Sequence, residues 1–415
     1  MVFFISRLNS FIWGGGTVAL LLITGSVYTI RLRAVQLSLP GFLLHGRRKH
    51  DTIKGLSQRK TVCMSLGAAM GTGNITGVAA ALAAGGPGAV FWMWVSAFLG
   101  MALVYAENSL SAIYSDGRIR GPMAYISKGL GCRRLADAFS AACIFAALGM
   151  GGMVQISSIA GEVTSCMDAP AVAVACISFF AVLYVTCGGA RRIGTAAELL
   201  LPAAALLYAA VCAAVIFASA EKLPAAFCSI FTEALGLRQA SGGTLGYALS
   251  VGIRRGIFSN EAGLGSSPLL HSAAGDSDLY TQSMWSMFEV FLDTMICCTL
   301  TALTIICAAP DLSINTAAGT ILGGGAGFFL SAVLTVFAFC TVTGWYYCGE
   351  AAFRHLFGGR HIRKFCVFFS VISASGAVLS AKTVWELSDV FNGVMMLLNL
   401  PALILLMKKV RRYKS

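Results

Sequence analysis

Long apolar runs, interrupted only by short polar gaps, extend through this sequence from end to end. Of its 415 residues 57% are hydrophobic and 12% are charged, about half of the roughly 25% charged residues typical of soluble domains. Runs such as "TVALLLITGSVYTI" and "GVMMLLNLPALILLM" lie in segments about long enough to cross the ~30 Å of hydrocarbon in a bilayer. We therefore expect an all-α polytopic membrane protein rather than a soluble globule.

The apolar runs predict eleven transmembrane helices. Their expected ranges are 12–34, 58–84, 87–114, 137–163, 170–187, 193–219, 243–270, 282–308, 322–352, 364–380 and 388–407. If the N-terminus is outside, 22 Lys and Arg residues fall in inner loops and 4 in outer loops. Cytoplasmic loops retain positive residues, so this distribution supports the number of helices, an outside N-terminus and a cytoplasmic C-terminus. It also explains the net charge of +12 without a nucleic-acid partner.

Side chains that carry enzyme chemistry are not grouped in recognisable motifs. The 14 cysteines are scattered singly, apart from the adjacent Cys297 and Cys298, which predicts buried free thiols rather than disulfides or a metal site. The sequence holds no HExxH motif, phosphate loop or Ser-His-Asp set that we can identify. We expect no enzyme and no resident cofactor.

Two of the predicted spans contain residues that a lipid-facing helix excludes. The first includes "MGTGNITG" at 70–77, in which glycines surround Asn74. The second, 243–270, includes "IRRGIFSNEAGLGSS" with Arg254, Arg255 and Glu261. A glycine costs about 1 kcal/mol in a helix interior, and a charge at mid-membrane costs ~2.5–3.5 kcal/mol. Such residues are tolerated where they face protein, water or a ligand.

The two weak spans start 185 residues apart, and each opens a set of five predicted helices. Because five is odd, the two sets are expected to insert in opposite orientations, and paired interrupted helices in such repeats indicate a transporter binding site. The expected organisation is an N-terminal helix and basic loop, a first repeat, an extracellular connection, a second repeat and a basic tail: 1–57, 58–219, 220–242, 243–408 and 409–415. The alternative is that the glycines only allow close helix packing.

Several stretches resemble the alanine/glycine:cation symporter family over about residues 8–408. They are "GAAMGTGNITGVAAALAAGG", "RGPMAYISKGLG", "RRIGTAAELLLP", "FSNEAGLGS", "FEVFLDTMICCTLTAL" and "TGWYYCGE". The resemblance implies the leucine-transporter-like scaffold, a 5+5 inverted repeat with two discontinuous helices, plus one N-terminal helix. It also implies a secondary active transporter that moves small neutral amino acids such as alanine and glycine with Na⁺ by alternating access.

The resemblance also assigns binding residues. Those expected around the substrate are Ala69, Thr72, Gly73, Asn74, Gln155, Phe258, Ser259, Asn260, Glu261 and Gly263. Those expected around Na⁺ are the carbonyls of Gly67, Met70 and Phe337 and the side chains of Cys340 and Thr341. The N–H groups of Thr72 and Gly73 are expected to meet the substrate carboxylate. Phe258 is expected to cap the pocket, and Asn260 and Glu261 either to hold the ammonium group or to order the break.

The chain departs from the family pattern at four positions. Gly152 and Ser157 replace asparagines, and Ile156 replaces a small residue. We expect Ile156 to narrow the pocket and Gly152 to open room on the same helix face, since residues four apart are neighbours. Cys340 stands where the family has Ser or Thr, and a thiol is a poor ligand for a hard cation, which predicts modest sodium affinity.

Other polar residues leave alternatives open. The acids Glu107 and Asp293 are expected either to relay an ion or proton or to make structural pairs. Glu198 is expected to pair with Arg191 or Arg192, and His271 to have no catalytic role. The expected partners are a small neutral amino acid, Na⁺ and the lipid bilayer of the cell (inner) membrane. Proton coupling on the same fold, or a non-transporting sensor or channel, are the alternatives.

Overall fold

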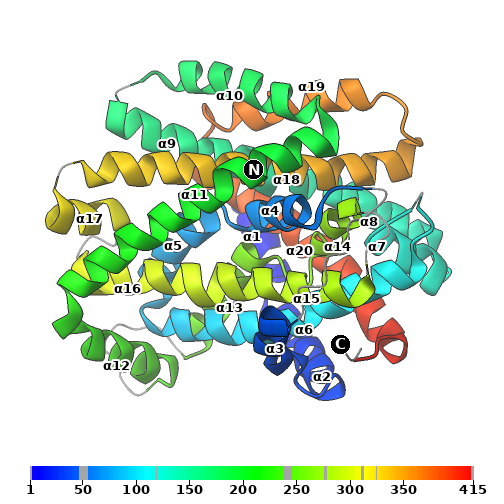
Figure 1. Ribbon diagram of the computed structural model, residues 1–415, viewed down its shortest axis with the longest axis horizontal. Coiled ribbons are helices and arrows are strands. Elements are labelled where there is room, and N and C mark those ends of the chain that lie inside the picture. Colours follow the sequence, from blue (N-terminus) through cyan, green and yellow to red (C-terminus); the bar gives the residue numbers. More distant parts are fainter. Residues whose placement is uncertain are drawn as a thin grey trace.

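A computed structural model describes residues 2–45, 55–117, 119–167, 169–236, 245–274, 278–309, 313–323 and 325–412. All regular secondary structure in these ranges is helical (Figure 1). Up to the end of the first predicted repeat the helices are α1 (Val2–Ile12), α2 (Gly15–Arg31), η1 (Val35–Ser38), α3 (Leu39–His45), α4 (Gln58–Ala69), η2 (Thr72–Asn74), α5 (Thr76–Gly85), α6 (Gly88–Tyr114), α7 (Pro122–Ala124), η3 (Tyr125–Gly129), α8 (Arg133–Ala146), η4 (Ala147–Val154), α9 (Gln155–Met167), α10 (Ala171–Thr186) and α11 (Gly189–Ala218).

The rest of the chain continues in the same way. Its helices are η5 (Ala220–Lys222), α12 (Leu223–Ala234), α13 (Leu245–Asn260), α14 (Ser267–His271), η6 (Ser272–Ala274), α15 (Leu279–Val290), η7 (Phe291–Cys298), α16 (Thr299–Ala308), α17 (Ile314–Leu322), α18 (Ala326–Phe357), α19 (Ile362–Ser375), α20 (Ala381–Leu406) and η8 (Met407–Lys409). The expectation of an all-α protein with two discontinuous helices is confirmed.

The contacts between the two sets of five helices are reciprocal. The second helix of the first set, α6, packs on α13, and α15 and α16 of the second set pack on α4 and α5. The third helices contact each other through α8, η4 and α9 against α18, and the fourth helices through α10 against α19. Likewise α11 packs on α18, and α20 packs on α8. Exchanging the two sets leaves this pattern unchanged, as expected for repeats related by a two-fold axis.

Seven helices of the described chain are long and apolar enough to cross a bilayer, and the bent pair of α4 with η2–α5 makes an eighth. The three remaining predicted spans coincide with shorter or interrupted helices. These are α10 at 170–187, α13 and α14 at 243–270, and α19 at 364–380. The protein is a multi-pass membrane protein, and the number of eleven spans stays a prediction.

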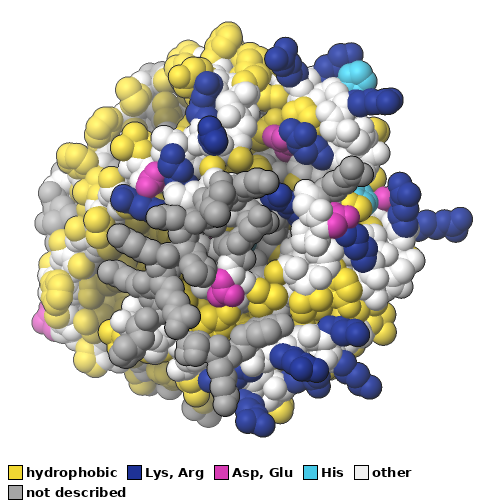
Figure 2. Space-filling view, turned by 45° about the vertical axis from the view of Figure 1, so that its right-hand side comes forward, with side chains coloured by type: hydrophobic (Ala, Val, Ile, Leu, Met, Phe, Trp, Pro, Cys, Tyr) yellow, Lys and Arg dark blue, Asp and Glu magenta, His cyan; other side chains and the backbone are white. Residues whose placement is uncertain are grey.

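Charged side chains are unevenly distributed over the surface. Figure 2 shows Lys and Arg gathered toward the right-hand part of the face, and hydrophobic side chains along its left-hand edge. Seven of the basic residues counted in the predicted loops lie outside the described residues: Arg47, Arg48, Lys49, Lys54, Arg118, Arg238 and Lys414. The orientation of the termini therefore stays a prediction.

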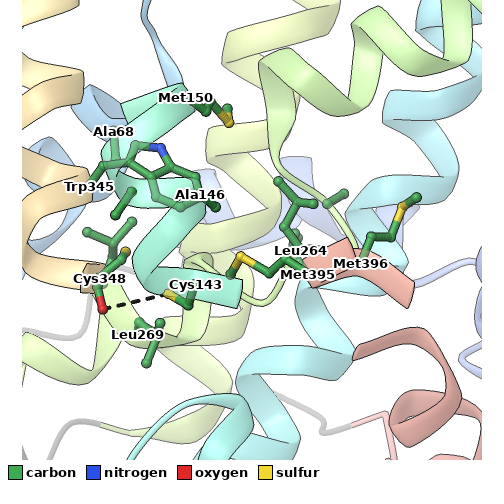
Figure 3. Packing of buried hydrophobic residues seen from close by; sticks show 14 of the residues in the cluster. Ala68, Cys143, Ala146, Met150, Leu264, Leu269, Trp345, Cys348, Met395 and Met396 are labelled. Carbon is green, nitrogen blue, oxygen red and sulfur yellow. Dashed lines mark hydrogen bonds between the residues drawn. The ribbon is translucent and has the colours of Figure 1, made fainter. Parts of the chain in front are cut away.

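Apolar packing surrounds the middle of the bundle, where the interrupted helices lie. In Figure 3, Trp345 of α18 lies close to Ala68 of α4, and Leu264 lies beside Met395 of α20. Trp345 and Met395 are fully buried. This close packing holds irregular backbone inside protein, which is where a membrane protein tolerates it.

Candidate functional site

The first interrupted helix breaks where the glycines predicted it. Helix α4 ends at Ala69, one turn of 3-10 helix follows, and α5 leaves at an angle of 56° to α4. We call residues 70–75 the first break. The N–H of Thr72 donates to Oε1 of Gln155 (3.1 Å), and the Gln155 amide donates to the carbonyl of Met150 (3.2 Å). Gln155 therefore ties the first break to the third helix of the first set.

The second interrupted helix breaks between α13 and α14, and we call residues 261–266 the second break. Glu261, Gly263 and Gly265 have positive φ, a backbone conformation that glycine adopts freely and glutamate rarely does. The Glu261 carboxylate accepts hydrogen bonds from Trp345 Nε1 (2.6 Å) and Ser266 Oγ (2.5 Å). Both oxygens are thus engaged by protein donors, which fits a role in ordering the break.

The two interrupted helices meet each other. A Cβ added to Gly73 would lie 3.2 Å from the Phe258 ring and 3.4 Å from Cα of Ser259, so the first break packs directly on the last turn of α13. Asp293, in the π-helical η7, joins the two: it accepts from Asn74 Nδ2 (2.7 Å) and from Ser259 Oγ (2.6 Å). Asp293 is fully buried. One carboxylate therefore bonds to both interrupted helices.

Three buried polar atoms around these contacts have no hydrogen-bond partner in the described chain. They are Thr72 Oγ1 and Asn74 Oδ1 at the first break, and Asn260 Nδ2, whose side chain lies toward α6: a Cβ added to Gly100 would be 3.7 Å from Asn260 Oδ1. Buried polar groups in native proteins are nearly always paired, so unpaired ones in one region indicate a place for a polar ligand or water. The Thr72 hydroxyl can accept or donate, Asn74 Oδ1 can accept, and Asn260 Nδ2 can donate, each to a neutral or a charged partner.

Oxygen atoms converge at the end of α4, where the cation site is expected. Thr341 Oγ1 donates to the carbonyl of Gly67 (2.9 Å) and lies 3.1 Å from the carbonyl of Phe337. A Cβ added to Gly67 would lie 3.1 Å from Cβ of Cys340. The structure thus brings four of the five expected cation residues together. Met70 is buried at the first break, next in the chain to Ala69 and Gly71.

Phe258 separates the meeting point of the breaks from a cavity of about 470 Å³. Its ring stacks on Trp385 of α20 with centroids 4.8 Å apart, and the Arg255 guanidinium lies 5.1 Å from the Trp385 ring. Trp385 and Arg255 line this cavity. Arg254, beside them, forms an ion pair with Asp389 of α20.

A second cavity of about 360 Å³ lies beyond the second break, along α14. His271 lines it and belongs to a buried network: its ring nitrogens contact Gln282 Oε1 (2.7 Å) and Glu289 Oε2 (3.0 Å), and Ser65 donates to Glu289 (2.7 Å). The two cavities approach the interrupted helices from the α13 side and the α14 side respectively.

Two expected site residues face elsewhere. A Cβ added to Gly263 would point at Leu400 and Leu21, and the Gly263 carbonyl accepts from Asn399 (3.0 Å), so Gly263 does not face the first break. A Cβ added to Gly152 would collide with Ser373 of α19, so Gly152 opens no room in the pocket. Both expectations are corrected. For Gly152 the reason is that the π-helical η4 packs on α19.

The structure also shows the partners of three acidic residues that the sequence singled out. Glu107 accepts from Asn399 Nδ2 (2.7 Å) and so contacts the second break through a shared partner. Glu198 forms its ion pair with Arg59 (3.1 Å) rather than with Arg191 or Arg192, because α11 packs along α4. Asp293 was recognisable in the sequence only as a lone acid in an apolar run, and nothing there indicated its two partners.

Comparisons with known proteins agree with this geometry. The sequence profile of the sodium:alanine symporter family matches residues 1–415. A sodium/alanine symporter of Methanococcus maripaludis is 36% identical, over 97% of this chain and 94% of the relative. A putative sodium/proton-dependent alanine carrier protein of Bacillus subtilis is 33% identical, over 98% and 90%.

The fold is similar to a solved structure. A Na⁺-coupled sialic acid symporter in a substrate-bound outward-open state has a TM-score of 0.59 at 12% identity, over 98% of this chain and 88% of that one. At this identity the likeness concerns the fold, which is the leucine-transporter-like scaffold. From the match over its whole length, the chain belongs to the sodium:alanine symporter family.

Proposed function

We propose that this protein couples the entry of Na⁺ to the uptake of a small neutral amino acid such as alanine or glycine, by alternating access. The observation that carries the proposal is the meeting of the two interrupted helices at Gly73 and Phe258, with unpaired buried polar atoms around it. Discontinuous helices from two repeats form the substrate and ion sites of many secondary transporters.

The substrate is proposed to lie between the first break and the last turn of α13. Gly73 lets the first break lie directly against the Phe258 ring and Ser259, and the substrate would enter this contact when the two helices separate, with Phe258 between it and Trp385 of the larger cavity. Thr72 Oγ1 and Asn74 Oδ1 are acceptors for an ammonium group. The Thr72 N–H, once Gln155 turns away, is a donor for a carboxylate. An amino-acid zwitterion satisfies both kinds of group.

Na⁺ is proposed to bind where Thr341 Oγ1 meets the carbonyls of Gly67 and Phe337. A hard cation prefers such oxygen ligands, and the remaining ligands would be the Met70 carbonyl and Cys340.

We further propose that the N-terminus is outside and the C-terminus cytoplasmic, in the cell membrane. Inward movement of one positive charge then gains ~2.3 kcal/mol per 100 mV of membrane potential.

Uptake of labelled alanine into proteoliposomes tests the proposal. Uptake that accumulates under an inward Na⁺ gradient, and disappears when K⁺ replaces Na⁺ on both sides, is the expected result. Equal uptake with and without the gradient would contradict coupled transport.

Proton coupling is the second candidate, and the buried carboxylate of Asp293 between the two interrupted helices is the observation that favours it. Uptake driven by a pH gradient in the complete absence of sodium would select this candidate. Asp293, Glu107 and Glu261 would then be the acids to replace.

A further inference from the structure

Two cysteines from different helix sets bring their sulfur atoms into contact. The Sγ atoms of Cys187 and Cys366 are 3.3 Å apart, although the residues are 179 positions apart in the chain. Cys187 directly follows α10, and Cys366 lies in the first turns of α19. Figure 1 shows these two helices side by side at the top of the view. They are the fourth helices of the two sets, and they pack on each other.

The two thiols differ in exposure and in hydrogen bonding. Cys187 is exposed, whereas Cys366 is only 2% exposed. The hydroxyl of Thr186 donates its hydrogen to the carbonyl of Val182 (2.7 Å), so it accepts from the Cys366 thiol, whose sulfur is 3.0 Å away. Cys366 therefore directs its hydrogen to Thr186 and its lone pairs remain available to Cys187.

Cys187 is exposed beside a charged side chain, and we expect water-soluble reagents to reach it. Arg192 folds back over the end of α10, donating to the carbonyl of Tyr184 (2.6 Å) with its guanidinium 4.5 Å from the Tyr184 ring. A guanidinium in this place marks the polar edge of the membrane. Gly188 and Gly189 follow Cys187 and form the turn into α11. The backbone at Cys187 is thus at a helix end, where small movements cost little.

We propose that Cys187 and Cys366 form a site of reversible oxidation, at which a hydroperoxide converts the two thiols into a disulfide between α10 and α19. The Cys187 thiolate attacks the peroxide, forming a sulfenic acid and releasing the first water after protonation. The Cys366 sulfur then displaces the hydroxyl group from Cys187 Sγ, forming the S–S bond and releasing the second water. Two thiols are oxidised by two electrons, and one hydrogen peroxide is reduced to two waters.

The geometry needs little adjustment for this bond. A disulfide has its sulfur atoms ~2.05 Å apart, so the present contact of 3.3 Å must shorten by about 1.2 Å, and Cys187 lies at a helix end that can move. The other exposed thiol of α10, Cys176, has no sulfur partner among the contacts of the described residues. The contact between their sulfur atoms therefore distinguishes Cys187 and Cys366 from Cys176.

The disulfide joins elements that hold the proposed ion site. Helix α10 continues into α11, which packs on α4 with its Gly67 carbonyl, and α19 follows α18, which carries Thr341. We expect the bond to restrain the movement of α10 and α19 relative to each other and to α18, on which both pack. This expectation rests on the proposed transport function, and its consequence is a slower transport cycle. Reduction of the disulfide restores the free movement.

Mass spectrometry of non-reduced peptides tests the site, and alanine uptake tests its effect. Wild type, Cys187→Ser, Cys366→Ser and the matched control Cys176→Ser are reconstituted and exposed to hydrogen peroxide. The expected result is a linked Cys187–Cys366 peptide in wild type and Cys176→Ser only. In the same two proteins peroxide removes most of the initial uptake rate, and dithiothreitol restores it. Both remaining variants keep their rate in peroxide.

Absence of the linked peptide, or equal inhibition of wild type and Cys187→Ser, overturns the proposal. Unchanged uptake by a protein that carries the link overturns it as well. Detection of the linked peptide does not depend on transport. A protein that forms the link but carries no alanine, even when it is reduced, would therefore contradict the proposed transport function and not the oxidation site.

Discussion

The side-chain amide of Asn74 donates to one carboxylate oxygen of Asp293 at 2.7 Å, and Ser259 donates to the other oxygen at 2.6 Å. Asn74 belongs to the first break and Ser259 to the last turn of α13. Asp293 also accepts from Thr294 (2.8 Å), and its backbone carbonyl accepts from Asn74 (3.1 Å). The relative position of the two interrupted helices thus depends on one buried acid.

Replacement of Asp293 tests this dependence. In Asp293→Asn an amide NH2 replaces one acceptor. Toward Asn74 it would set two donors against each other, and toward Ser259 it would require the hydroxyls of Ser259 and Thr294 to accept where they now donate. Loss of a buried hydrogen bond to a charged group costs about 1.5–3 kcal/mol. We expect a lower melting temperature in detergent and loss of most alanine uptake. In the double variant Asn74→Ala/Asp293→Asn the donor that would oppose the new amide is absent, so its loss should be smaller than the sum of the two single losses; additive losses would contradict this.

Gly71 is predicted to tolerate no side chain at all. A Cβ there would lie 2.6 Å from Thr341 Oγ1 and 2.9 Å from Gln155 Oε1, two atoms that the site uses. At Gly77 the nearest atom to an added Cβ is 3.9 Å away, so Gly77→Ala is the matched control and gains helix propensity of about 1 kcal/mol. Gly71→Ala should abolish alanine binding measured by calorimetry, while Gly77→Ala keeps it. Equal affinities in the two variants would place the ligand elsewhere.

The sequence predicted the interrupted helices well because their cause is local. Glycines, Asn74 and Glu261 are unfavourable in a lipid-facing helix wherever the rest of the chain lies, so their positions alone indicated the breaks. The side-chain partners depend on tertiary packing, and those were not predictable. Gln155 bonds to Thr72, and Asp293 joins Asn74 to Ser259, only because helices distant in the sequence come together.

Of the two corrected residues, Gly152 is the one whose position depends on how its helix packs on α19. The expectation for Gly152 assumed 3.6 residues per turn from Gly152 to Ile156. The π-helical stretch Ala147–Val154 packs on α19, and Gly152 lies at that contact, facing Ser373. Such π turns are common at functional sites and have no reliable sequence signal.

Gly73 is predicted to be the position at which added bulk blocks the substrate. A side chain there points at the Phe258 ring, 3.2 Å from the first added carbon. Gly73→Leu should therefore insert and fold but lose alanine binding in calorimetry, with size-exclusion chromatography as the check on folding. Normal alanine affinity in a well-folded Gly73→Leu protein would refute the proposed substrate position.

Phe258 is predicted to limit the size of the amino acid. It is 3% exposed and lies between the first break and the 470 Å³ cavity with Trp385 behind it. Glycine, alanine and serine should compete with labelled alanine in wild type, and tryptophan should not. Phe258→Leu leaves space for larger side chains, so methionine and leucine should become competitors. The control is Phe145→Leu, at an exposed phenylalanine of α8 that stacks on Phe391, and it should keep the wild-type order. The same order in Phe258→Leu would count against the cap.

The cation site yields the last prediction, because its ligands differ in hardness. Thr341 supplies a hydroxyl oxygen beside the carbonyls of Gly67 and Phe337, whereas Cys340 supplies a neutral thiol. Cys340→Ser replaces sulfur by oxygen, which a hard cation prefers, and should lower the sodium concentration for half-maximal alanine uptake.

Thr341→Val removes one oxygen ligand and should raise that concentration strongly. It also removes the one hydroxyl hydrogen that meets the buried carbonyls of Gly67 and Phe337, a loss of about 1–3 kcal/mol, so Thr341→Ser serves as the control that keeps the hydroxyl. The measurement is alanine uptake into proteoliposomes across a sodium titration of all four proteins. Identical half-saturation in wild type, Cys340→Ser and Thr341→Val would mean that the ion binds elsewhere, whereas opposite shifts in the two variants, with Thr341→Ser near wild type, require it to sit between α4 and α18.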